Sequence, residues 1–232
     1  MKTTTYPNQV PSLPKKSKAP VSKVRMWLVP VGLLLLSVIP ITFGIARLNE
    51  LASGAEITPD NARFFASPLP VIIHIISSAI YAVLGAFQFV SRLWRHGTLW
   101  HRNVGRLLVP LGLFVGLSGL WMTLFYTQTK NASDLLYALR LLFGSGMVIS
   151  IGLGYAAILR RDILQLRAWM MRAYAIGLGA GTQVLTGIVG AVLLGTPNAL
   201  ENALLMGAAW VINLAIAEWI IRRRLPHTVR TA

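Results

Sequence analysis

The feature that most constrains the fold is a series of six apolar runs, each about the 20 residues that a helix needs to cross a bilayer. The runs cover residues 26–46, 69–90, 107–127, 136–158, 173–195 and 202–221. Composition agrees, since only 12% of the residues are charged and the mean hydropathy is +0.62, whereas soluble domains are about 25% charged. We therefore predict an all-α integral membrane bundle of six transmembrane helices over residues 26–221.

Charge alternates along the connections between these runs. Of the 22 Lys and Arg residues, 18 lie in segments 1–25, 91–106, 159–172 and 222–232, and the other connections hold three. Basic residues accumulate on the cytoplasmic side of membrane proteins. We therefore predict that both termini are cytoplasmic, and that 91–106 and 159–172 are cytoplasmic loops of a protein in the bacterial inner membrane.

The net charge of +15 has two interpretations, nucleic-acid binding or contact with a membrane surface. The basic residues sit at the ends of apolar runs, and no nucleic-acid motif lies between them, so we expect anionic lipids at the cytoplasmic face and no nucleic acid. Segments 1–25 and 222–232 are predicted to be basic cytoplasmic tails, the first of them disordered because it is rich in Pro and Lys. The first run exceeds the 7–15 residues of a signal-peptide core, which favours an uncleaved helix over cleavage at "ASGA" (52–55).

Polar residues inside the runs are candidates for function, because burying them in a membrane is costly. The second run carries a stripe of such residues at helical spacing, and the later runs carry single ones. Helix–helix packing is the alternative explanation for the small members, and for Arg140 the alternative is snorkelling to the interface rather than an outer-leaflet site shared with His74. The candidates are His74, Ser77, Ser78, Tyr81, Gly85, Gln88, Arg140, Gln183 and Asn213.

A second candidate site lies where three runs meet the cytoplasmic face. Arg106 enters the third run, Arg172 enters the fifth, and Glu218, the one acid within any run, ends the sixth. We predict a cluster of His101, Arg102, Arg106 and Arg172 closed by Glu218, with Gly105 allowing close backbone approach. The alternative is that each Arg meets lipid headgroups, and that Glu218 pairs with Arg222 one helical turn away.

Catalytic and cofactor motifs are not found in the sequence. There is no Cys, HExxH, GxGxxG or Walker loop, so no thiolate metal site and no motif-based nucleotide site is predicted. A membrane haem b needs two axial ligands at matching depth, and His74 is the one deep histidine. We predict no catalytic residue, no metal and no cofactor, with haem b held by His74 and one of Met122, Met147 or Met206 as the alternative.

Four stretches together resemble a bacterial family of predicted membrane proteins, domain of unknown function 2306. They read "HIISSAIYAVLGAFQF" (74–89), "HRNVGR" (101–106), "RAWMMRAYA" (167–175) and "WVINLAIAEW" (210–219). The resemblance implies a multi-pass bacterial inner-membrane protein and no particular activity. It marks His74, Gln88, His101, Arg102, Gly105, Arg106, Trp169, Met170, Arg172, Tyr174, Asn213 and Glu218. Leu166 departs from the family's His, and Gln183 from its Arg; if that His is a haem or metal ligand in relatives, the role is lost here.

Three functions remain open from the sequence. The first is a non-enzymatic scaffold, partner subunit or small-solute conduit, which fits the lack of catalytic groups and leaves room for a membrane-protein partner. The second is a redox component that binds haem b or quinone, based on His74 and the His/Arg cluster. The third is a transporter, although the chain shows no internal repeat that an inverted-repeat transporter would require.

Overall fold

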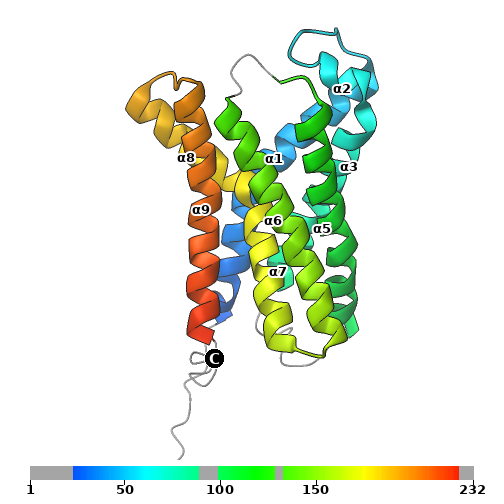
Figure 1. The fold of residues 1–232 in the computed structure, drawn as a ribbon, viewed down its shortest axis with the longest axis vertical. Helices are drawn as coiled ribbons and strands as arrows, with labels where there is room; N and C mark the ends of the chain where they lie inside the picture. The colour runs from blue at the N-terminus through cyan, green and yellow to red at the C-terminus, as the bar shows by residue number, and fades with distance from the viewer. Residues whose placement is uncertain (1–22, 89–98, 129–132, 225–232) are drawn as a thin grey trace, which may run out of the picture.

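The computed structural model describes residues 23–88, 99–128 and 133–224. This part of the chain is helical, with no strand among the described residues. Figure 1 shows the helices in chain order. They are α1 (Lys23–Ser53), α2 (Ala62–Ala66), α3 (Pro68–Gln88), α5 (Leu99–Phe125), α6 (Asp134–Leu159), α7 (Ile163–Gly177), α8 (Gly179–Leu194) and α9 (Ala199–Arg224).

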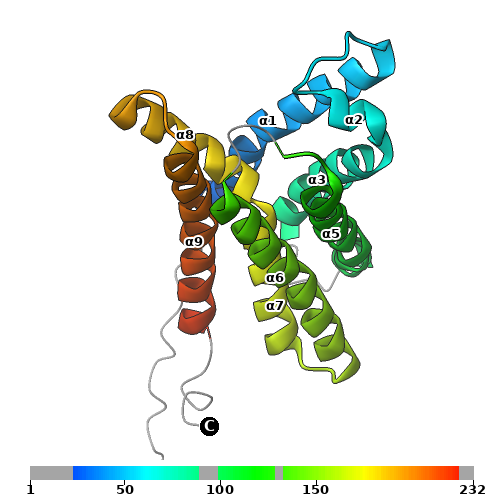
Figure 2. The same ribbon diagram turned by 45° about the horizontal axis from the view of Figure 1, so that its top comes forward.

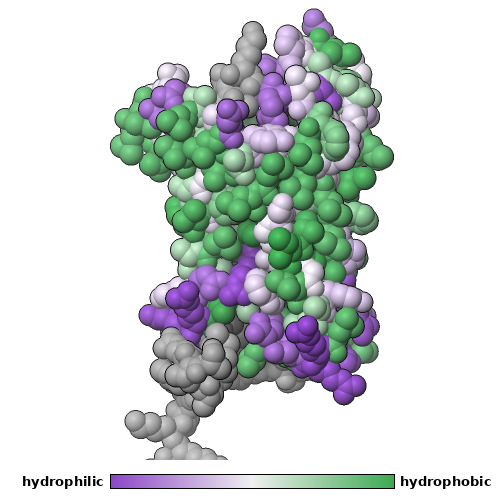
Figure 3. Space-filling view, in the orientation of Figure 1, coloured by the Kyte–Doolittle hydropathy of each residue, from purple (hydrophilic) through white to green (hydrophobic). Residues whose placement is uncertain are grey.

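Five helices are each long and apolar enough to cross a membrane: α1, α3, α5, α6 and α9. A sixth span is formed if α7 and α8 are taken together, although they are bent by 44° at their junction. On the face shown in Figure 3, a hydrophobic band crosses the middle of the molecule, with hydrophilic residues toward both ends. The prediction of an all-α membrane bundle is confirmed, and the fifth predicted run, 173–195, is a broken helix pair.

Several predicted boundaries are wrong, because hydropathy marks only the part of a helix that meets hydrocarbon. Residues 99–106, assigned to a loop, form the first turns of α5, and most of 159–172 belongs to α7. The predicted tail 1–25 lies outside the described residues up to residue 22, and its last three residues begin α1. The predicted tail 222–232 begins with the last turn of α9, and 225–232 lie outside the described residues.

The connection between α6 and α7 is a tight turn. Arg161 adopts a left-handed conformation (φ 58°), and the next backbone N–H, of Asp162, donates to the Ala157 carbonyl over 2.9 Å. Asp162 then caps α7, its Oδ1 accepting from the Gln165 N–H at 3.0 Å. This turn satisfies backbone groups that helix ends leave open, so the two helices run antiparallel in close contact.

The packing order follows these short connections. α3 packs on α5, α6 on α7, and α8 on α9, while α1 contacts α3 and α8. Figures 1 and 2 show α7 inside the bundle, next to α6, and α8 leaning away beside the start of α9. The buried core joins α3, α5, α6 and α7 through Tyr81, Val115, Phe143, Met147, Ile151 and Tyr174, among others.

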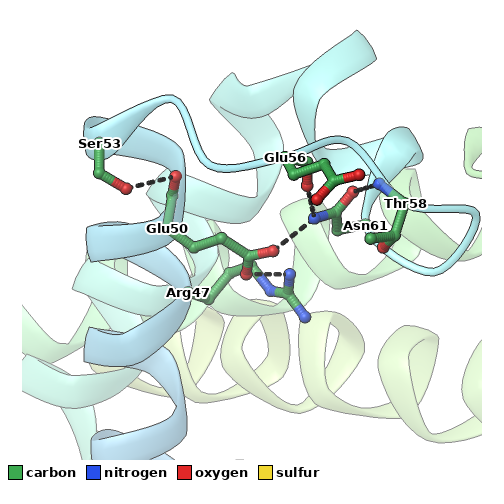
Figure 4. Close-up of polar contacts among 6 residues, drawn as sticks. All are labelled: Arg47, Glu50, Ser53, Glu56, Thr58 and Asn61. Carbon is green, nitrogen blue, oxygen red and sulfur yellow. Dashed lines mark hydrogen bonds and ion pairs between the residues drawn. The ribbon is translucent and has the colours of Figure 1, made fainter.

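The bundle has two chemically different ends. One end, which we call the Arg-rich end, holds the α6–α7 turn, the start of α5 and the end of α9. The other, the α2 end, holds α2 and the loop that precedes it. Figure 4 shows how that loop is fastened: buried Asn61 donates from Nδ2 to Glu50 Oε1 (2.6 Å) and to the Glu56 carbonyl (2.9 Å), and its Oδ1 accepts from the Thr58 N–H (2.7 Å).

Candidate functional site

The predicted cluster at the Arg-rich end is reduced to one ion pair. Arg172 on α7 binds Glu218 on α9 through both carboxylate oxygens, with Nε–Oε1 2.5 Å and Nη2–Oε2 3.2 Å. The Arg172 guanidinium also lies over the Trp169 ring, 4.4 Å from its centroid. Arg222 approaches Glu218 at 3.9 Å and is largely exposed. Two-point contact and the aromatic face fix the guanidinium in one orientation, so this pair joins α7 to α9.

The α5 members of the predicted cluster lie elsewhere. Arg102 and Arg106 are exposed and make no ion pair with Glu218 in the described structure. α5 packs on α3, α6 and α7, and it is not among the main contacts of α9. An added Cβ at Gly105 would meet open space, so the predicted close approach there is wrong. The side chain of His101 lies outside the described residues. Similar depth in the membrane was therefore insufficient to place α5 beside α9.

Asn213 holds the broken span together. Its Nδ2 donates to the Ala175 carbonyl of α7 (3.1 Å), and its Oδ1 accepts from the Thr182 hydroxyl of α8 (2.8 Å). The break at Leu178 removes the helical partner of some α7 carbonyls, and Asn213 replaces it from α9. Gly179 lets Trp210 approach at this point, since a Cβ there would lie 2.2 Å from the indole nitrogen. Asn213 thus supplies hydrogen-bond partners to polar groups at the helix break, within an otherwise apolar layer.

Two tyrosines pack where α3, α5 and α7 meet. Tyr174 donates its hydroxyl to the Ala82 carbonyl of α3 (2.7 Å). Its ring occupies the space over Gly85, where a Cβ would lie 2.1 Å from the ring. The Tyr81 ring lies 5.6 Å from that of Tyr174. Met170, another residue marked by the family resemblance, packs against Gly154 of α6. These residues therefore stabilise close helix packing.

A partly open cavity of about 460 Å³ lies between the helices and is lined from every described helix. Its apolar lining includes Ile75, Met122, Phe143, Met147, Ile176, Met206 and Trp210, and its polar lining includes Arg63, His74, Gln128, Arg140 and Gln183. Ligand pockets have this composition, an apolar wall with a few placed polar groups, and volumes of roughly 300–1,000 Å³. The intramembrane candidates His74, Arg140 and Gln183, distant in sequence, thus line one cavity.

His74 has one ring nitrogen engaged and one free of protein partners. Nδ1 lies 3.1 Å from the Val115 carbonyl and 3.0 Å from the Ser118 hydroxyl. The carbonyl can only accept, so Nδ1 carries the proton and Nε2 is left with a lone pair. Nε2 makes no hydrogen bond to any described residue. The ring is thus fixed in one tautomer at the cavity wall.

Apart from Arg140, the other polar candidates have structural partners. The serines of the α3 stripe bond to their own helix, as Ser77 does to the Ile73 carbonyl at 2.5 Å. Gln183 donates from Nε2 to the Met206 carbonyl at 3.5 Å, which is weak. Gln88 ends α3 and does not line the cavity. The stripe as a whole is therefore a packing surface, and His74 is the stripe residue that presents an unbonded ring nitrogen at the cavity wall.

Arg63 is a site residue that the sequence analysis counted only as a loop charge. Its Nη1 donates to the Thr127 carbonyl (3.2 Å), while its Nε is buried without a hydrogen bond. The Phe64 ring lies between two guanidiniums, 4.7 Å from that of Arg63 and 4.5 Å from that of Arg47. Partial burial, and then the nearby charge of Arg47, lower the pKa of Arg63. The signal available in sequence was a basic residue next to an aromatic one just before the second run.

Comparison with known proteins agrees with the fold. No curated protein and no solved structure matches this chain, and no group of metal-ligating side chains occurs among the described residues. The family model described as "Predicted membrane protein (DUF2306)" matches residues 71–221, from within α3 to the last turn of α9. This match covers more than half of the sequence and confirms the resemblance. The chain therefore belongs to the DUF2306 family of predicted membrane proteins.

Proposed function

We propose that this protein is a non-enzymatic membrane protein that holds a small molecule in the cavity between its helices, as a binding subunit or as a solute conduit. The observation that supports this most is the cavity itself, about 460 Å³ with a mostly apolar wall and several polar side chains. Interior polar groups elsewhere, such as those of Asn213 and Tyr174, are bonded to backbone. The groups that remain for a ligand are gathered in the cavity.

The orientation is part of the proposal. The basic Arg-rich end faces the cytoplasm of a bacterial cell, where anionic lipids meet it, and the α2 end with Arg63 and Arg140 faces outward. The distribution of 18 basic residues supports this. Reporter fusions after residues 60, 132 and 198 should report outside, and fusions after 97, 164 and 228 inside. A cytoplasmic signal at 60 or 132 would invert the orientation.

Binding can be tested with 1-aminoanthracene, a neutral fluorescent probe of suitable size. The purified chain in a two-chain maltoside detergent should bind it saturably at one site. Ala79 lines the cavity, so Ala79→Leu should weaken binding at least fivefold. Ala138 lies exposed on α6, and Ala138→Leu is the matched control that should bind normally. Non-saturable partitioning that is equal in both variants would refute a binding cavity.

A second candidate is the redox component. It is favoured by the free Nε2 of His74 and by three methionines, Met122, Met147 and Met206, in the same cavity wall. Haem-ligating histidines commonly donate their other nitrogen to a backbone carbonyl, as His74 does. Our proposal predicts no Soret band in protein purified from cells supplied with haem precursor. A stoichiometric band that is lost in His74→Ala would replace the first function with this one.

A further inference from the structure

The cavity lining has an unbalanced charge. Arg63 and Arg140 both line it, and none of its lining residues is Asp or Glu. Arg63 comes from α2 and Arg140 from α6, so the two guanidiniums approach from separate helices. Like charges brought together in a partly buried space repel each other. A wall of this kind is stabilised when an anion enters.

The acids of this chain are located elsewhere or already engaged. All seven Asp and Glu residues of the sequence lie in its described part. Glu50 binds Arg47 with one oxygen and Asn61 with the other (Figure 4). The ion pairs of the described chain join Arg47 with Glu50, and Arg172 and Arg222 with Glu218. Neither cavity arginine therefore makes an ion pair among the described residues; Asp60 lies near enough to attract the charge of Arg63, but it does not line the cavity.

Both guanidiniums keep hydrogen-bond donors that the protein does not use. A guanidinium carries five N–H donors. Arg63 uses one for Thr127, and its buried Nε has no acceptor. Arg140 is half-buried and makes no hydrogen bond or ion pair to a described residue. The hydroxyls nearby are taken, as Tyr126 donates to the Ser67 carbonyl (2.6 Å) and Thr123 to the Gly119 carbonyl (2.8 Å). The cavity wall therefore lacks hydrogen-bond acceptors for the remaining N–H groups of the two guanidiniums.

The rest of the lining is suited to hydrocarbon. It is dominated by Ile75, Met122, Phe143, Met147, Ile176, Met206 and Trp210, and it reaches the α7–α8 break at Gly177 and Leu178. An inorganic anion alone would leave that apolar space unfilled, whereas an alkyl chain that fills it is stabilised by every CH₂ group removed from water. The ligand therefore has a charged head and an apolar body.

We propose that the cavity binds a single-chain amphiphile with an anionic head group, and that Arg63 and Arg140 hold the head, a carboxylate or a phosphate. This rests on the proposed function and names its ligand class. The planar fork of Arg matches both oxyanions, which accept two parallel N–H bonds. The alkyl chain lies along the apolar wall toward the helix break.

The test is competition against bound 1-aminoanthracene with four molecules: dodecanoate, dodecyl phosphate, dodecanol and inorganic phosphate. Dodecanoate or dodecyl phosphate should displace the probe at concentrations at least tenfold lower than dodecanol. Inorganic phosphate at the same concentrations should not displace it. The ratio between the two amphiphilic acids identifies the preferred head group.

Variants of the two cavity arginines, with Arg223→Gln as the control, assign the effect to these residues. Arg140→Gln should weaken the acids at least tenfold and dodecanol less than twofold, with each competitor measured relative to the variant's own saturable binding of 1-aminoanthracene. Arg223→Gln, which removes an exposed charge at the Arg-rich end, should change neither. Arg63→Gln should act as Arg140→Gln does.

The failures are distinguishable. If dodecanol competes as well as dodecanoate, or if Arg140→Gln weakens both equally, the anionic head is refuted and the binding cavity stands. If inorganic phosphate alone competes, the apolar body is refuted. If 1-aminoanthracene itself does not bind saturably, the proposed function fails before the head group is tested.

Discussion

We expect the side chain of Asn213 to contribute most to the fold of the broken span formed by α7 and α8, and Asn213→Ala removes it. The amide bridges the two halves of the broken helix, accepting from Thr182 and donating to the Ala175 carbonyl. Ala175 and Thr182 are both buried. Water is therefore not available to replace the lost partner at either group.

The magnitude follows from what is left unbonded. Hydrogen bonds between membrane helices contribute about 0.6 kcal/mol each on average, with a maximum near 1.7. The Ala175 carbonyl has no other hydrogen bond across the break, and an unsatisfied buried group costs about 1–3 kcal/mol. Together these predict that Asn213→Ala lowers the free energy of unfolding by about 2–3 kcal/mol. Thr182→Val, which leaves the Ala175 contact intact, should lower it by about 0.6–1 kcal/mol.

Reversible unfolding of the purified protein in mixed micelles, titrated with sodium dodecyl sulfate, measures both changes. The double variant should be less destabilised than the sum of the two, because Thr182 loses its partner already in Asn213→Ala. An effect of Asn213→Ala below about 0.5 kcal/mol, or strict additivity with Thr182→Val, would refute the bridging role.

Two further predictions use the same unfolding titration. Glu218→Gln and Arg172→Gln should show a coupling energy of about 1 kcal/mol, as expected of a charge-assisted contact that is partly exposed. Glu218→Gln should be additive with Arg106→Gln, because Arg106 lies on α5 away from the pair. Coupling to Arg106 instead would restore the larger predicted cluster. Gly85→Ala should lower the free energy of unfolding by about 1–3 kcal/mol, since its Cβ would overlap an aromatic ring of α7 and overpacking has that cost. Gly105→Ala, where the space is open, is the control and should be neutral or stabilising by up to about 1 kcal/mol; an equal loss in both would mean that ring packing is not the cause.

The spans were predictable because the hydrophobic effect acts on every residue of a run and needs no knowledge of neighbours. The same holds for the two differently charged ends. The pairing of Arg172 with Glu218 was also within reach, since an acid near a helix end and a basic residue at similar depth have few other partners. The same reasoning wrongly placed Arg106 in the cluster, because the depth of a residue along its helix does not determine where that helix lies around the bundle.

The break at Leu178 was not predicted, and the reason is local. Residues 173–195 are continuously apolar, and hydropathy cannot distinguish a straight span from a bent one. The available signals were Gly177 and Gly179 on either side of Leu178, and an Asn at similar depth in the next run. Glycines are common in close-packed membrane helices, so this pattern alone predicted packing. The fastening of the loop by Asn61 depends on contacts across eleven residues, which single-sequence reasoning does not capture.

The distribution of used and unused polar groups gives the strongest link from this fold to a function. In a bilayer interior, a polar side chain is retained when its bonds are needed by the protein or when something else uses them. Asn213, Thr182 and Tyr174 belong to the first kind, because their bonds hold helices together. Arg140 does not, since it makes no hydrogen bond or ion pair to a described residue and shares the cavity with the like charge of Arg63. Replacing Arg140 with Gln should therefore stabilise the ligand-free protein or leave its unfolding unchanged, while replacing Asn213 destabilises it. This difference in the free energy of unfolding, measured in the same titration, separates residues kept for the fold from residues kept for a ligand.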